Sequence, residues 1–122
     1  MKSRSNPFLR SASLAVSIVL TLGQAASAAN YYWNTTTTGT WANGANWSDN
    51  ATSGGITGVV PLSTDSVFFN QSSVNGAEIV QLDAPASIAG ITFANTGTTL
   101  INASAAGSQA LTIGTGGITV GL

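Results

Sequence analysis

Three tryptophans, Trp33, Trp41 and Trp47, are the side chains of this sequence best suited to bind a ligand. Indole faces stack on sugar rings, and Asn46 offers an amide to sugar hydroxyls. Buried indoles can instead cover the apolar end of a β-structure, with each N–H bonded to a nearby acceptor. We predict the structural role, and the alternative is a glycan-binding surface made of Trp33, Trp41, Trp47 and Asn46.

The acidic residues offer little chemistry. Two carboxylates are the minimum for glycoside hydrolysis, and Ca²⁺ takes six to eight oxygen ligands. Asp49 and Asp65 lie among Ser, Thr and Asn residues in settings typical of Asx turns, and no calcium-loop motif surrounds them. Glu78 and Asp83 flank the segment Ile79-Val80-Gln81-Leu82. We predict turn formers at Asp49 and Asp65, solvated strand-end charges at Glu78 and Asp83, and neither a catalytic residue nor a metal site.

Residues 29–122 contain no Lys, Arg, His or Cys. A serine nucleophile needs a neighbouring base, and zinc sites use His or Cys. Nucleic-acid binding needs cations to contact phosphates, and the glycine-rich nucleotide motifs are missing. We therefore predict a protein that is not an enzyme, uses no cofactor and binds no nucleic acid.

The first 28 residues have the three parts of a secretory signal. Three basic residues occur within the first ten positions, and the apolar run Leu14–Leu22 and the small-residue end Ala26–Ala28 follow. The apolar run is shorter than the roughly 20 residues that cross a bilayer. We predict a signal peptide at 1–28, cleaved after Ala28, and a secreted or cell-surface product of formal side-chain charge −4 that does not insert stably into membranes.

The remaining chain favours β-structure. Gly, Thr, Ser and Asn dominate it, and no stretch has a 3.6-residue apolar period. Short β-branched or aromatic runs separated by turn residues predict strands near 31–34, 40–42, 56–60 and 66–70. The fold class predicted is all-β.

A repeated triplet appears in the second half of the chain. Ile91–Phe93, Leu111–Ile113 and Ile118–Val120 all read apolar-Thr-apolar, and Gly90 and Gly117, which precede two of them, are 27 residues apart. In a strand the outer residues of a triplet face one side and Thr the other. Stacked triplets of this kind would form the rungs of a β-solenoid, and a β-sandwich is the alternative.

Several motifs occur in an order that resembles the start of a known family. They are Tyr32-Trp33-Asn34, Gly39-Thr40-Trp41, Asn46-Trp47-Ser48, Pro61, Asp65-Ser66-Val67-Phe68-Phe69 and Ile88-Ala89-Gly90-Ile91-Thr92-Phe93. Together they resemble bacterial autotransporter-associated β-strand repeat proteins over about residues 32–120. The resemblance implies a right-handed β-helix stalk that is exported and often displayed at the outer membrane. Because only about two rungs and no translocating barrel are present, we expect a truncated member or the N-terminal portion of a longer protein.

These observations predict a signal peptide at 1–28, a Trp-rich N-terminal cap at 29–70 and β-helix rungs at 71–122. The function expected is that of a non-catalytic exported passenger module, the start of a surface stalk or adhesin-like protein. A small secreted carbohydrate-binding module is the alternative. The last two triplets are apolar and uncharged, so we also expect self-association through the C-terminal edge.

Overall fold

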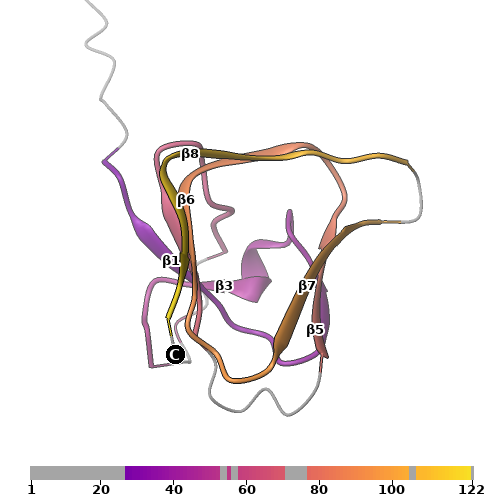
Figure 1. Cartoon of the computed structure of the whole chain (residues 1–122), viewed down its shortest axis with the longest axis horizontal. Helices are drawn as coiled ribbons and strands as arrows, with labels where there is room; N and C mark the ends of the chain where they lie inside the picture. Colours follow the sequence, from indigo (N-terminus) through magenta and orange to yellow (C-terminus); the bar gives the residue numbers. More distant parts are fainter. Residues whose placement is uncertain (1–26, 53–54, 56–57, 71–76, 105–106, 122) are drawn as a thin grey trace, which may run out of the picture.

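The fold is built almost entirely from short β-strands (Figure 1). A computed structural model describes residues 27–52, 55, 58–70, 77–104 and 107–121, so most of the predicted signal peptide lies outside the described residues. The elements within these residues are β1 (Asn30–Trp33), β2 (Thr38–Thr40), the 3₁₀ turn η1 (Gly44–Asn46), β3 (Trp47–Ser48), β4 (Ser66–Phe69), β5 (Ala77–Leu82), β6 (Ala86–Phe93), β7 (Thr98–Ala103) and β8 (Leu111–Val120). The predicted all-β class is confirmed.

The strands form two sheets, between which the chain alternates. The first has the order β3-β1-β4-β6-β8, and the second has the order β2-β5-β7. Neighbouring strands are parallel throughout, except that β3 runs antiparallel to β1. Figure 1 shows the chain winding so that β6 and β8 follow the same path. The alternation is interrupted only at β3 and β4, which follow one another and both belong to the first sheet; from β4 to β8 the chain changes sheet with every strand described.

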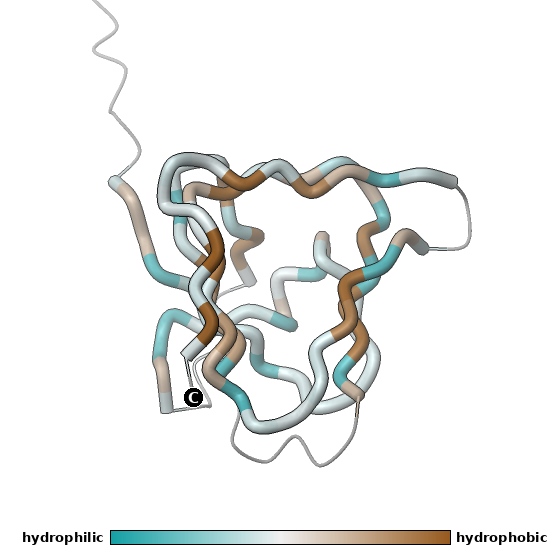
Figure 2. The backbone as a smooth tube through the Cα atoms, viewed as in Figure 1, coloured by the Kyte–Doolittle hydropathy of each residue, from teal (hydrophilic) through white to brown (hydrophobic). Residues whose placement is uncertain are grey.

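Pairing in the first sheet aligns apolar residues into rows. Val67 on β4 pairs with Ile91 on β6, which pairs with Ile118 on β8. Gly90 pairs with Gly117, so the predicted stacking of the first and third triplets is confirmed. In Figure 2 the most hydrophobic residues recur along the same sides of the winding chain. Buried faces on stacked parallel strands explain why these short segments are rich in Ile, Val and Phe.

The middle triplet is placed differently from the expectation. Leu111–Ile113 belongs to the same strand as Ile118–Val120 and pairs with Ala86–Ile88, not with a separate rung. The strand can carry both triplets because it turns a corner at its glycines, next to a register shift in β6. A Cβ at Gly116 would lie 2.8 Å from the Ala89 carbonyl oxygen. Only a residue without a side chain allows that close approach.

The core joins the aromatic segment to the later strands. Its fully or nearly fully buried residues are Trp33, Trp41, Trp47, Val67, Phe69, Val80, Leu82, Ile88 and Ile91. Burying a side chain of this size contributes about 1.5–3 kcal/mol. The aromatic segment supplies β1 and β4 in the interior of the first sheet. It is therefore continuous with the strands that follow, and residue 70 marks no break in the sheet.

The shorter predicted strands are shifted or missing. The strand expected at 40–42 lies at Thr38–Thr40. The segment expected at 56–60 forms no strand at its described positions 58–60. Gly58 there has a positive φ of 67°, which interrupts the extended backbone that a strand requires.

Candidate functional site

The three tryptophans predicted as cap or ligand surface form one buried cluster. Trp33 and Trp47 are 0 % exposed and Trp41 is 2 % exposed. The Trp47 ring meets Trp33 edge to face at 4.9 Å and Trp41 at 4.8 Å between centroids. Its Nε1 donates a hydrogen bond of 2.8 Å to the carbonyl oxygen of Trp41. Sugar stacking needs an open ring face, and these faces are covered by neighbouring side chains.

Asn46, the amide predicted to accompany the tryptophans, is used inside the protein. Its Nδ2 donates to the carbonyl oxygen of Thr40 at 2.8 Å, and its backbone oxygen accepts from Asn34 at 2.8 Å. A Cβ at Gly39 would lie 2.7 Å from this amide, so glycine makes room for it. The side chain is half-buried and holds the end of β2, while the backbone of the same residue holds the residue after β1.

The two aspartates considered for catalysis or calcium binding have different surroundings. Asp65 is only 4 % exposed and accepts from two backbone amides, Ala29 N at 2.9 Å and Leu62 N at 2.8 Å. Asp49 is exposed. The turn beside it is held by other side chains, since Asn50 N donates to Ser48 Oγ at 3.0 Å. Asp65 therefore closes a local turn by accepting from the backbone amide of Leu62, three residues earlier. An Asx turn would instead use a backbone amide two residues later.

Glu78 corrects a prediction. It was expected to be a solvated strand-end charge, yet it is 0 % exposed. Strand β5 alternates, so Glu78 shares the inward face with Val80 and Leu82. The sequence did not show which face would be buried, because apolar residues occur on both faces of this segment. Asp83 is exposed, as predicted.

The Glu78 carboxyl is only half satisfied. Its Oε1 accepts from Thr99 Oγ1 at 2.7 Å and from Asn95 Nδ2 at 3.3 Å. Its buried Oε2 has no partner among the described residues. Burial raises the pKa of Glu78 above 4.5, and the hydrogen bond from Thr99 opposes that shift. Strand β5 thus carries an acid in the core, and its ionised form is disfavoured because burial removes the water that would solvate the charge.

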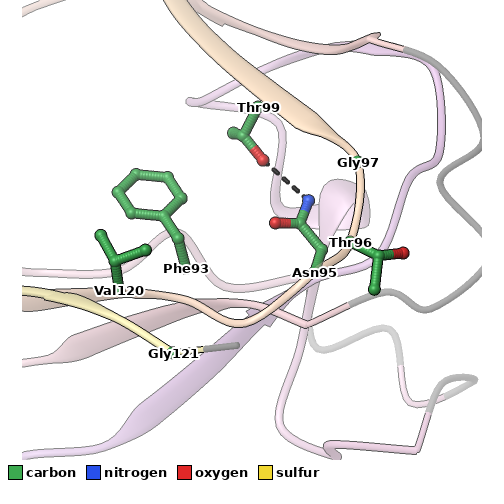
Figure 3. Close-up of a pocket in the computed structure, with 7 residues that line it drawn as sticks. All are labelled: Phe93, Asn95, Thr96, Gly97, Thr99, Val120 and Gly121. Atoms are coloured by element: carbon green, nitrogen blue, oxygen red, sulfur yellow. Dashed lines mark hydrogen bonds between the residues drawn. The ribbon is translucent and has the colours of Figure 1, made fainter.

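An open pocket of about 350 Å³ lies next to this acid (Figure 3). Its lining comes from the end of β6, the following turn, the start of β7 and the end of β8: Phe93, Asn95, Thr96, Gly97, Thr99, Val120 and Gly121. Asn95 and Thr99 are bonded to each other at 2.8 Å. Both Asn95 and Thr99 also donate to Glu78 Oε1, so the buried acid fixes the position of these two lining side chains. No charged side chain lines the pocket.

The same end of the molecule exposes large apolar residues. Ile118 is 65 % exposed, although it continues the row of Val67 and Ile91, which are buried. Val120 is 72 % exposed and continues the row of buried Phe69 and half-buried Phe93. Strands β8 and β7 are the last strands of their sheets on this side. We call β7, β8 and the pocket between them the C-terminal face. At the opposite edge, β3 is covered, since Trp47 and Ser48 are at most 1 % exposed.

The described part of the chain offers neither a metal-binding cluster nor a membrane-spanning helix. No group of three or more His, Cys, Asp or Glu side chains there is close enough to hold a metal ion. None of the helical segments in that part has the length and apolar character needed to span a membrane. Comparison of the chain with protein-family models, with curated proteins and with solved structures finds no match.

Proposed function

We propose that the chain is an exported, non-catalytic structural module, the start of a surface stalk or adhesin-like passenger wound as a short right-handed β-helix. The parallel pairing of β1, β4, β6 and β8 carries the proposal. In a β-helix each turn of the chain returns to the same sheet one strand further on, which gives parallel neighbours. β-sandwiches are built instead from antiparallel pairs, and among the described strands only β1 with β3 is antiparallel.

The chemistry of the side chains supports a structural role. Residues 29–122 offer no ionisable groups beyond four acids and two tyrosines. Two of the acids, Asp65 and Glu78, are buried and hydrogen-bonded within the protein. The buried tryptophan cluster likewise favours a packing role over the glycan-binding alternative. A stalk needs a stable stack of strands and no reactive group, and this composition suits it.

A cross-linking experiment tests the β-helix. Thr92 on β6 and Thr119 on β8 are register partners, so Thr92→Cys with Thr119→Cys should form a disulfide within one chain. The native sequence has no cysteine to interfere. The matched control is Thr92→Cys with Thr112→Cys. Thr112 pairs five residues away along β6, at Ser87, beyond the roughly 7 Å between Cα atoms that a disulfide can span.

The expected result is oxidation of the first pair to a monomeric disulfide and no such product from the control. Equal cross-linking of both pairs, or of neither, would contradict the β-helix. Export is tested separately by expressing the whole chain in a bacterium and measuring the intact mass of the product. Secreted or surface-bound protein that begins at Ala29 is expected, whereas cytoplasmic protein that begins at Met1 would overturn the export proposal.

A further inference from the structure

We propose that export creates an ion pair: cleavage after Ala28 turns the backbone nitrogen of Ala29 into an ammonium, which the buried carboxylate of Asp65 binds. The inference rests on the proposed export, because it needs a chain that begins at Ala29. That chain has no Lys, Arg or His. The new N-terminus is therefore its one fixed cation, and Asp65 is placed to receive it.

The geometry needed for the pair is already present. Ala29 N lies 2.9 Å from Asp65 Oδ1. The carbonyl oxygen of Ala29 accepts from Ser66 N at 2.9 Å, so both backbone polar groups of Ala29 are held against the start of β4. Because the carbonyl group of Ala29 is held by Ser66, its nitrogen is kept facing Asp65 and not solvent.

Asp65 is equally fixed. Its other oxygen, Oδ2, accepts from Leu62 N at 2.8 Å, and its own backbone nitrogen donates to Leu62 O at 2.9 Å. Its carbonyl oxygen accepts from Ala89 N at 2.7 Å, which ties it to β6. With 4 % of its surface exposed, the carboxylate is shielded from water. An ammonium at Ala29 would make one of the two hydrogen bonds of this carboxylate charge-assisted.

The predicted cleavage site coincides with the edge of the folded body. Ser27 and Ala28 are exposed, Ala29 is half-buried, and β1 begins at Asn30. The position of the cut was predicted from the small-residue pattern alone, whereas the contact with Asp65 spans 36 residues of sequence. The predicted cleavage and the contact with Asp65 therefore involve the same nitrogen.

The chemical step is hydrolysis by a signal peptidase. Water adds to the carbonyl carbon of Ala28, the bond to Ala29 N breaks, and the products are an Ala28 carboxylate and an Ala29 amine. The amine takes up a proton at neutral pH. A neutral amide hydrogen bond to Asp65 then becomes a charge-assisted one, which is roughly twice as strong. The processed chain should accordingly be more stable than the same fold with Ala29 acylated.

The absence of lysine allows a selective test. In a protein of residues 29–122 the α-amine is the sole primary amine, so an amine-selective acetylating reagent applied to the unfolded protein should modify Ala29. The acetyl group also mimics the carbonyl of Ala28 in the precursor. After refolding, the acetylated protein is compared with untreated protein by thermal unfolding. We expect acetylation to lower Tm by about 4–8 °C, because the hydrogen bond remains but the positive charge is lost.

Two variants show whether the effect passes through Asp65. In Asp65→Asn, acetylation should change Tm by less than about 1 °C, because no carboxylate remains to pair with the ammonium. In Asp83→Asn, which alters an exposed acid, the full decrease should persist. Should Asp65→Asn fail to fold, the rate of acetylation of the native protein decides instead. The paired ammonium should react on the order of tenfold more slowly than in urea, because it is held in a charge-assisted bond.

Each outcome is assigned by the intact mass of the starting material. A product that does not begin at Ala29 refutes the cleavage and the ion pair with it. If the product begins at Ala29, the ion pair is refuted when acetylation leaves Tm unchanged and the amine reacts equally fast in the native protein and in urea. Export would still stand in that case. An equal loss of Tm on acetylation in wild type and in Asp65→Asn also overturns the assignment to Asp65.

Discussion

Replacing Trp47 with phenylalanine tests whether the aromatic cluster is a core or a ligand surface. Trp47 contacts the rings of Trp33, Trp41 and Phe69, and its Nε1 donates to the carbonyl oxygen of Trp41. The smaller ring would keep part of the packing, but it would lose the donor and leave space beside Trp41. Both losses should appear directly in the free energy of unfolding.

The size of the effect follows from the two losses. A buried carbonyl left without its donor costs about 1–3 kcal/mol. Emptying part of a packed site adds about 1–2 kcal/mol, at the lower end of the range for core truncations. The free energy of unfolding should therefore fall by about 2–5 kcal/mol. Small domains have only about 5–15 kcal/mol in total, so the variant should be markedly less stable.

Urea unfolding followed by circular dichroism measures the difference. The control is Leu62→Ala, since Leu62 is a large apolar residue that is 57 % exposed, and its replacement should change stability by no more than about 0.5 kcal/mol. If Trp47→Phe is as stable as this control and instead abolishes binding to a glycan array, the indole is a ligand-binding group. The buried-cluster reasoning would then be refuted.

Three further results are expected. Because burial raises the pKa of Glu78 above 4.5, the folded state holds this proton more tightly than the unfolded chain. The stabilising contribution of Glu78 should therefore be complete below about pH 4.5 and be lost as pH rises through the folded pKa; urea unfolding across pH should show this contribution as the difference between wild type and Glu78→Gln. Ile118→Lys should weaken self-association in sedimentation velocity, because Ile118 lies on the uncharged edge of the C-terminal face. Leu62→Lys, which changes an exposed residue outside that face, should leave self-association unchanged. A wild-type monomer at all concentrations would contradict this. Calcium and EDTA should give melting midpoints within about 1 °C, and a rise of more than about 5 °C with calcium would mean that Asp49 or Asp65 binds the ion.

Local properties of the sequence were enough to predict the all-β class, some of the strands and one of their contacts. The abundance of Gly, Thr and β-branched residues without a helical period predicts β-structure, because these preferences act within a few residues of chain. The 27-residue spacing of Gly90 and Gly117 predicts their pairing, since repeated rungs place equivalent residues side by side. The lack of side-chain cations in residues 29–122 is likewise a property of the sequence alone.

Contacts between distant segments required the tertiary structure. The segment Ile79–Leu82 has hydrophobic residues on both faces of a strand, so only the packing of Val80 and Leu82 into the core decides that Glu78 is turned inward. The bond from Trp47 to the carbonyl of Trp41 depends on the antiparallel turn that brings β3 beside β1. Asp65 reads as a turn residue in sequence, but it meets Ala29 because β1 and β4 are paired across 36 residues. Such pairings are determined by the register of whole strands, which the residues around each position do not specify.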